Sequence, residues 1–317
     1  MTPSVAPSRG RIVLAFAIVY LVWGSTYLGI RFAIQSIPPF LMAAARFLIA
    51  GAVLYAWSLR EGGTAPTRRQ WWNATVVGVL LLTLGNGLVT WAELKVPSGL
   101  AALIVAAMPV WLVLLEAVRP GGMRPAGLVV IGVAVGIVGQ VILVGPSADG
   151  SAVNLVGVAG LVIATMSWAA GSIRARLVDL PASRSRTTAM EMLGGGAGLL
   201  IIGLLHGEAP ALLAADITPR SLLALGYLTV FGSLLAFTAF VWLNTHVAPA
   251  RVATYAYVNP VVAVFLGWLL AGEPVTTRTL IGAGIIVGAV VMINTAGARS
   301  AQRTVRAPVG AQLRTDG

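Results

Sequence analysis

The chain contains no cysteine and only two histidines among its 317 residues. The absence of cysteine excludes disulfide scaffolds, thiolate catalysis and metal sites built on cysteine ligands. Charged residues are also scarce, at 10% of the chain, whereas soluble domains usually carry about a quarter. This scarcity excludes an ordinary soluble protein, and the high apolar content excludes intrinsic disorder.

Hydrophobic residues make up 58% of the chain, and the mean hydropathy is +0.90. A helix that crosses a bilayer needs about 20 mostly apolar residues, whereas the strands of membrane barrels alternate over about 10. Ten long and uniformly apolar runs are present, at approximately residues 12–33, 40–59, 73–94, 99–118, 126–144, 154–173, 188–206, 221–243, 249–271 and 279–296. We therefore predict an all-α integral membrane protein with ten spans, surrounded by the lipid bilayer.

The net charge of +11 would by itself favour a nucleic-acid partner. The basic residues lie instead in the short gaps between apolar runs, where they determine topology, so we expect no nucleic-acid partner. Most of them fall in the two tails and the even-numbered loops: Arg9, Arg11, Arg60, Arg68, Arg69, Arg119, Arg124, Arg174, Arg176, Arg184, Arg186, Arg251, Arg299, Arg303, Arg306 and Arg314. The opposite side receives Arg31, Lys95, Arg220 and Arg278. Both termini are therefore predicted to be cytoplasmic. The protein itself is predicted to lie in the cell membrane, which is the inner membrane where a cell has two.

The two halves of the chain resemble each other. Pro97 and Pro249 are 152 positions apart, and Pro109 and Pro260 are 151 apart, while Trp23 and Trp168 are 145 apart. The offset is nearly constant within each part of the halves and changes where one loop is longer. This pattern is typical of a duplicated unit. We predict two five-helix repeats, 12–145 and 154–296, between an N-terminal tail of residues 1–11 and a disordered tail of residues 297–317. Because five is odd, the repeats are inverted, which favours a site near the membrane midplane.

Short strings in both halves match those of a known family. In the first half they are Trp23-Gly24-Ser25-Thr26-Tyr27 followed by Arg31, then Pro38-Pro39, Arg46-Phe47, Gly85-Asn86-Gly87 and Val96-Pro97-Ser98-Gly99. In the second half the string is Tyr255-Ala256-Tyr257-Val258-Asn259-Pro260. From about residue 12 to 296 the chain closely resembles the EamA-type transporters of the drug/metabolite transporter superfamily, and within them the YedA-like exporters.

This resemblance implies a ten-helix fold with cytoplasmic termini and a central substrate cavity. It also implies export of small amphipathic metabolites, such as amino acids, related compounds or drugs. We expect spans one, three, four, six, eight and nine to line the cavity and spans five and ten to pack outside it, because the last two contain few polar side chains.

Two charged residues lie several positions inside predicted spans, away from the span ends. A charge at the position of Arg46 is costly against lipid. It therefore indicates a counter-charge for a substrate carboxylate, a structural ion pair, or a side chain that reaches the headgroups. Glu191 is a possible coupling carboxylate, because burial raises a carboxylate pKa. Pairing of Glu191 with Arg184 or Arg186 is the alternative.

Two further glutamates, Glu93 and Glu116, lie at span ends, where we expect solvated side chains.

Aromatic and amide side chains supply the other candidate substrate contacts. The deep tryptophans and tyrosines could line the cavity or pack in the helix interfaces, and a ring N–H or O–H at that depth needs a partner. Buried amides favour hydrogen bonds between helices or to substrate. The candidate contacts, besides Arg46, are Trp23, Thr26, Tyr27, Asn86, Trp168, Tyr255, Tyr257 and Asn259. Pro109 and Pro260, each within a span, are candidate hinges or static packing kinks.

No enzyme signature is present. The two histidines are expected on opposite sides of the membrane, and no Walker A or H-E-x-x-H string occurs. We therefore expect a small-molecule transporter without cofactor or metal. A membrane scaffold or sensor that carries no solute is the alternative. The sequence leaves the substrate, the coupling ion and the oligomeric state open, and a homodimer is one of the assemblies that it allows.

Overall fold

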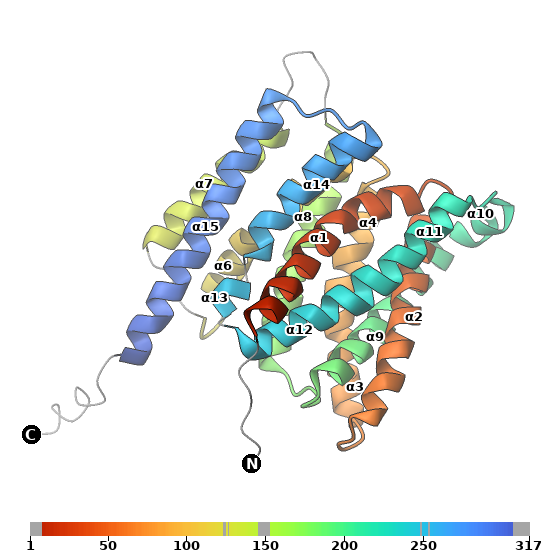
Figure 1. Ribbon diagram of the computed structural model, residues 1–317, viewed down its shortest axis with the longest axis horizontal. Coiled ribbons are helices and arrows are strands. Elements are labelled where there is room, and N and C mark those ends of the chain that lie inside the picture. Colours follow the sequence, from red (N-terminus) through yellow and green to blue (C-terminus); the bar gives the residue numbers. More distant parts are fainter. Residues whose placement is uncertain are drawn as a thin grey trace, which may run out of the picture.

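A computed structural model describes residues 8–122, 125, 127–144, 153–247, 249–252 and 254–306. Within these residues the regular structure is entirely helical (Figure 1). The elements are α1 (Arg9–Ala33), α2 (Pro39–Arg60), α3 (Arg68–Gly78), η1 (Val79–Asn86), α4 (Gly87–Ala92), α5 (Ser98–Val105), α6 (Met108–Val118), α7 (Gly127–Val144), α8 (Leu155–Leu177), α9 (Arg184–Leu205), α10 (Glu208–Ala214), α11 (Pro219–Tyr227), η2 (Leu228–Leu235), α12 (Ala236–His246), α13 (Pro249–Val252), α14 (Tyr255–Ala271) and α15 (Thr277–Arg306).

Nine helices in the described residues are long and apolar enough to cross a membrane. Three of these spans join consecutive elements: Arg68–Ala92 contains α3, η1 and α4, Ser98–Val118 contains α5 and α6, and Pro219–Leu243 contains α11, η2 and most of α12. The expected ninth run, 249–271, differs from the prediction. It divides into the short α13 and the 17-residue α14, which is apolar but shorter than the other spans.

The two prolines expected as hinges or kinks have different surroundings. α5 ends at Val105, and Pro109 occupies the first turn of α6. Proline is well tolerated there, because its missing N–H would have no intrahelical acceptor. Pro260 instead lies inside the continuous helix α14. Only the first of the two positions therefore coincides with an interruption of the helix.

The chain ends are more helical than expected. α1 begins at Arg9, within the expected tail 1–11, and the Ser8 hydroxyl caps it by accepting the Arg11 N–H at 3.4 Å. α15 continues to Arg306, so the first ten residues of the expected disordered tail are helical. The rest of that tail, 307–317, lies outside the described residues. The start of α1 and the end of α15 lie at the same end of the molecule (Figure 1).

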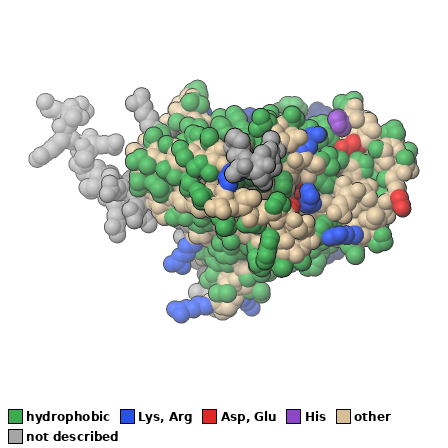
Figure 2. Space-filling view, turned by 90° about the horizontal axis from the view of Figure 1, so that it is seen from above, with side chains coloured by type: hydrophobic (Ala, Val, Ile, Leu, Met, Phe, Trp, Pro, Cys, Tyr) green, Lys and Arg blue, Asp and Glu red, His purple; other side chains and the backbone are tan. Residues whose placement is uncertain are grey.

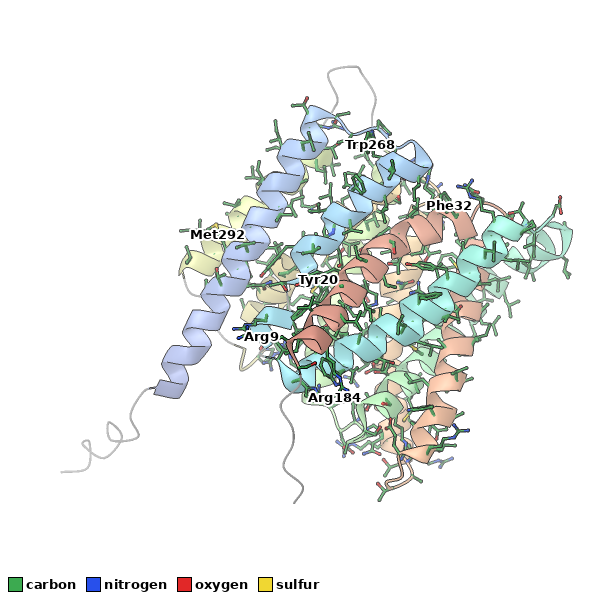
Figure 3. The ribbon with its side chains drawn as sticks, viewed as in Figure 1. Arg9, Tyr20, Phe32, Arg184, Trp268 and Met292 are labelled. Atoms are coloured by element: carbon green, nitrogen blue, oxygen red, sulfur yellow. The ribbon has the colours of Figure 1, made fainter. Side chains whose placement is uncertain are left out.

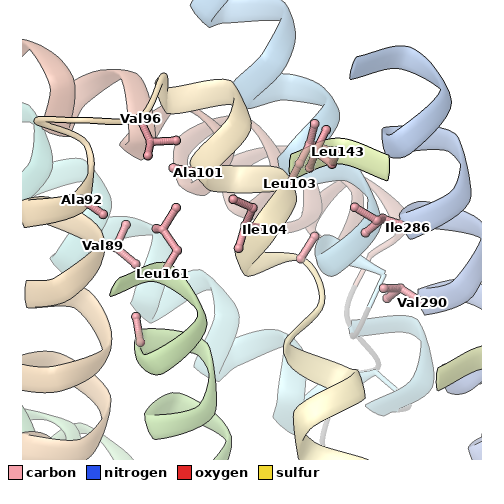
Figure 4. Packing of buried hydrophobic residues seen from close by; sticks show 12 residues of the cluster. Val89, Ala92, Val96, Ala101, Leu103, Ile104, Leu143, Leu161, Ile286 and Val290 are labelled. Carbon is pink, nitrogen blue, oxygen red and sulfur yellow. The ribbon is translucent and has the colours of Figure 1, made fainter. Parts of the chain in front are cut away.

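Helices distant in sequence pack side by side. α2 lies along α9, α7 along α15, α1 against α14 and α12, and α8 against η1 and α4. One hydrophobic cluster joins α4, α5, α7, α8 and α15 through side chains that include Val89, Leu103, Leu143, Leu161 and Ile286 (Figure 4). These contacts bring residues of the two halves into one core.

Glycines allow α7 and α15 to approach closely. A Cβ built on Gly132 would lie 2.8 Å from Ile293 Cγ1, and one on Gly139 would lie 2.8 Å from Ile286 Cγ1. Small residues have this role between helices in lipid. Gly284 and Gly288 of α15 lie 152 positions after Gly132 and Gly136, but a Cβ on either would meet nothing within 4 Å. This pair of glycines thus takes part in close packing in the first half only.

The outer faces of the helices are apolar. Leu128, Ile131, Val138 and Val141 of α7 are all exposed, as a lipid-facing helix requires. Seen from above, hydrophobic side chains cover much of the surface and charged groups are few and scattered (Figure 2). Arg9 and Arg184 lie toward the end at which the chain begins, whereas Phe32 and Trp268 lie toward the opposite end, which we call the distal end (Figure 3).

Candidate functional site

Two π-helical segments interrupt spans at matching places in the two halves. η1 begins at Val79 and η2 at Leu228, and each has eight residues. Their separation of 149 positions falls between the offsets of the earlier and later sequence matches. Segments of this kind are rare and frequently mark functional sites, because the wider turn alters the backbone hydrogen bonding of the helix. The two segments, one in each half, therefore mark the region of a candidate site.

Three candidate residues converge on η2. Trp23 of α1 donates its ring N–H to the Gly232 carbonyl at 3.1 Å. Arg46 of α2 is only 5% exposed and donates from Nε to the Ser233 hydroxyl at 2.8 Å. A Cβ on Gly232 would lie 3.2 Å from both Thr26 Cγ2 and an Arg46 guanidinium nitrogen. Glycine at position 232 therefore allows α1 and α2 to meet η2.

An aromatic group extends this site toward α14. The rings of Trp23 and Tyr255 lie 5.3 Å apart in an edge-to-face arrangement. Phe240 of α12 lies 5.0 Å from Trp23 and 5.6 Å from Tyr255. Such ring pairs are stabilising and offer flat apolar surfaces. The structure thus brings two candidate residues together and adds Phe240, which the sequence did not single out because phenylalanine is common in spans.

The first-half segment η1 has its own partners. A Cβ on Gly85 would lie 3.6 Å from the ring of Trp168, and the Ser167 hydroxyl donates to the Leu80 carbonyl at 2.8 Å. Asn86, the last residue of η1, has a buried Oδ1 with no hydrogen-bond partner among the described residues. Trp168 of α8 therefore packs on η1 in the first half, while Trp23 of α1 packs on η2 in the second.

The remaining aromatic and amide candidates are engaged elsewhere. The Tyr257 hydroxyl accepts from the Asn294 amide of α15 at 2.9 Å. In the amide orientation that satisfies both groups, Asn259 donates to the carbonyls of Tyr20 at 3.3 Å and Tyr255 at 3.2 Å. Tyr27 packs against the hydrophobic cluster that joins α4, α5 and α8. These side chains bind α14 and α1 to their neighbours.

Glu191 does not form the expected pair with Arg186. The guanidinium of Arg186 donates instead to the carbonyls of Ser58, Gly62 and Thr64 at 2.8–2.9 Å. Among the described residues, no ion pair involves Glu191. The pairing alternative therefore has no support, because carbonyls at the end of α2 already satisfy the arginine.

Two carboxylates that the sequence analysis passed over stabilise helix starts at the distal end. Glu273 accepts the N–H groups of Ser98 and Gly99 at 2.7 and 2.9 Å. Glu208 accepts the N–H groups of Phe40 and Leu41 at 3.2 and 2.8 Å. Helix starts attract negative charge because their first N–H groups lack intrahelical acceptors. Glu273 also pairs with Arg31 of α1 at 3.3 Å.

Glu93 contradicts the expectation of a solvated span end. It lies one residue beyond the span Arg68–Ala92 and is only 1% exposed. Burial raises the pKa of its carboxyl well above the ordinary value, and the nearby charge of Glu273 acts in the same direction. The sequence signal that could have found it is a carboxylate placed directly after a long apolar run.

Glu116 is a partly exposed surface group, close to what we expected. It pairs with Arg176 at 3.6 Å and also with Arg119, three residues along the chain.

A cavity of about 210 Å³ opens at the distal end beside Glu273. Lys95 and Arg278 supply positive charge to its wall, and Pro97, Leu100 and Val264 supply apolar surface. The described residues hold no group of three or more His, Asp or Glu side chains arranged to bind a metal ion.

Comparison with known proteins agrees with this architecture. The sequence pattern of the EamA-like transporter family matches residues 10–145 and again residues 155–295. The uncharacterized inner membrane transporter YedA of Escherichia coli is 40% identical over 276 residues, which cover 87% of this chain and 88% of YedA. The protein PecM of Dickeya dadantii is 28% identical over 276 residues, 86% of this chain and 88% of PecM.

A solved crystal structure of a protein at 22% identity shares the fold. It has a TM-score of 0.61 and covers 95% of this chain and 100% of its own. The apolar helices, the two matches to one family pattern and the similarity to an inner membrane transporter lead to one conclusion. The chain belongs to the EamA-like transporter family and is a multi-pass membrane transporter.

Proposed function

We propose that this transporter exports small amphipathic metabolites, amino acids or related compounds, from the cytoplasm by alternating access. The observation that carries the proposal is the arrangement around the two π-helical segments. Trp23 and Trp168, one from each half, pack on η2 and η1, and an arginine, a threonine and an amide lie beside them.

The proposed architecture is a pair of inverted five-helix repeats, 12–145 and 154–296, with both termini in the cytoplasm. It is supported by the two separate matches to the family pattern and by the matching positions of η1 and η2. The side-by-side packing of α2 with α9 and of α7 with α15 pairs corresponding spans across the halves. Inverted repeats of this kind place their substrate site where the halves meet.

In the proposed site the apolar part of the substrate lies against Trp23, Trp168 and Tyr255. Its polar groups meet Thr26, Arg46 and the unpartnered Oδ1 of Asn86. Tyr27, Tyr257 and Asn259, whose side chains contact neighbouring helices, would hold the α1 and α14 walls of this site in place. A single buried cation suits one carboxylate and disfavours sugar phosphates and nucleotides, whose additional charges would stay unpaired in a medium of low dielectric constant.

The proposed motion is a rocking of one half against the other. Pro109 lies at the interruption between α5 and α6, so this span can bend without breaking regular hydrogen bonds. Pro260 removes one N–H from α14 and would act as the second flexible point. Glu191, near the end of the molecule at which the chain begins, remains a candidate coupling carboxylate.

A flux assay tests the proposal. Purified protein is reconstituted into liposomes, and the entry of labelled amino acids, amines and sugar phosphates is measured with and without an imposed pH gradient. We expect uptake of at least one amphipathic solute above that of protein-free liposomes, and none of the sugar phosphates. A chain that carried no solute would instead be a scaffold or sensor. The same purified preparation can also be used to measure whether the protein forms a homodimer.

A further inference from the structure

Glu93 differs from the other buried carboxylates at the distal end. Glu208 and Glu273 each accept two backbone N–H groups. Neither carboxylate oxygen of Glu93 has a hydrogen-bond partner among the described residues, although the residue is 1% exposed. An isolated ionised carboxylate is very costly to bury, so such a group binds a proton instead. In this conformation Glu93 therefore holds a proton.

Burial keeps the proton on Glu93; the negative charge of Glu273 acts in the same direction, and the positive charge of Arg31 opposes it. Arg31 of α1 and Glu273, in the segment after α14, are the charged groups that act on it, and Tyr27 of α1 also lies within its electrostatic reach. Arg31 is already paired with Glu273 at 3.3 Å. The ammonium of Lys95 lies over the Trp91 ring at 5.4 Å. The nearby cations are thus engaged elsewhere.

The groups around Glu93 connect the distal cavity with the proposed substrate site. Glu273 and Lys95 line the 210 Å³ cavity, so water there reaches groups that lie close to Glu93. Tyr27, which lies within the electrostatic reach of Glu93, is one helical turn from Trp23, and residues four apart share one face of a helix. A movement of α1 relative to α14 would therefore change the Arg31–Glu273 pair, the surroundings of Glu93 and the aromatic group together.

We propose that Glu93 is a proton-binding site that couples transport to a proton gradient, which rests on the transport function proposed above. When the site opens to one side, the O–H bond of the carboxyl breaks and the proton passes to water. Arg31, released from Glu273, then stabilises the carboxylate. Reprotonation from water on the other side completes the exchange, with one proton moved for each cycle.

A transport experiment tests the coupling. Wild type, Glu93→Gln and the exposed-site control Glu61→Gln are reconstituted with a solute that the flux assay identifies. Gln has the shape and neutrality of a protonated Glu, so Glu93→Gln should retain solute exchange within about twofold yet lose stimulation by a pH gradient. Glu61→Gln should match wild type. If a pH gradient still stimulated solute flux in Glu93→Gln, the proposal would be overturned. Loss of that stimulation in Glu191→Gln would assign the coupling to Glu191 instead.

A second measurement needs no substrate. Dicyclohexylcarbodiimide modifies protonated carboxyls in apolar surroundings, and trypsin releases residues 70–95, in which Glu93 is the only carboxylic side chain. We expect mass spectrometry to find modification of this peptide that declines as the pH rises, and none in Glu93→Gln. An unmodified Glu93 at every pH would refute the proton site. Modification without any solute flux would instead refute the proposed transport function alone.

Discussion

The guanidinium of Arg46 on α2 donates its Nε hydrogen to the hydroxyl of Ser233 on η2, at 2.8 Å. This bond crosses from the first half of the chain to the second and ends on the irregular segment of the span. A buried cation held by one neutral hydroxyl retains donors for a further acceptor, because a guanidinium has five N–H groups. Arg46 is therefore well placed to meet a substrate carboxylate.

Replacement of Arg46 should reduce the transport of some solutes and not of others, according to their charge. Arg46→Ala is expected to reduce transport of acidic and zwitterionic solutes about tenfold or more. This factor corresponds to the free energy of a charge-assisted hydrogen bond. Cationic solutes should change little. Competition flux with matched acidic and basic solutes measures the difference. Ser233→Ala is the control, since it removes the hydroxyl but keeps the cation. Equal losses for both solute classes would contradict a role in charge recognition.

The close approach at Gly232 predicts a sharp steric effect. Gly232→Ala places a methyl group 3.2 Å from Thr26 Cγ2 and from an Arg46 guanidinium nitrogen, so these side chains must shift by a few tenths of an ångström and transport should fall several-fold. Gly226→Ala, in the same span, is the matched control because its added Cβ meets nothing within 4 Å. Flux normalised to the amount of inserted protein distinguishes them. Equal flux in the two variants would show that the approach at η2 is unimportant.

Loss of the Asn259 amide should impair transport more than insertion. Asn259→Ala removes the donors to the carbonyls of Tyr20 and Tyr255, which loosens α14 from α1. One amide contributes little to the insertion of an apolar helix, so the membrane-bound amount should stay near wild type. Quantitative blotting of membranes, together with flux, checks both statements. A variant that inserts and carries every tested solute at the wild-type rate would exclude Asn259 from the site.

The pH dependence of the stability of the folded protein should identify Glu93 as a carboxyl that is protonated in the folded state. Its pKa is raised in the folded state, so above the ordinary carboxyl value of about 4.5 the folded protein binds more protons than the unfolded chain. Stability conferred by the neutral carboxyl is therefore present at acid pH and declines as the pH rises. Thermal unfolding in detergent should show that wild type loses stability relative to Glu93→Gln as the pH rises above the ordinary carboxyl pKa of about 4.5. Parallel pH profiles would contradict this assignment.

The proposed orientation of the chain predicts on which side of the membrane its C-terminus lies. Because most arginines fall on one side, a reporter active only in the periplasm should be silent when fused after Arg306, beyond the end of α15. The same reporter inserted between Val153 and Asn154 should be active. Activity in the first fusion and silence in the second would reverse the proposed topology.

Local properties of the chain predicted most of the spans, because apolar run length decides whether a helix can cross lipid. The depth of Arg46 likewise predicted a side chain that avoids lipid, and it is only 5% exposed. Glu93 could not be predicted in the same way, since the charged groups that act on it, Arg31 and Glu273, are distant in sequence. The different packing of Gly132 and Gly284 also depends on which helix face meets a neighbour, and glycine spacing alone does not reveal it.

The shortness of α14 has a consequence for the surrounding lipid. Its 17 residues extend about 25 Å at 1.5 Å per residue, less than the roughly 30 Å hydrocarbon thickness of a typical bilayer. A helix that is too short cannot correct the mismatch by tilting, so the acyl chains beside it must compress or the polar segments at its ends must enter the headgroup boundary. Bilayer thickness therefore acts directly on the helix that carries Tyr255 and Asn259.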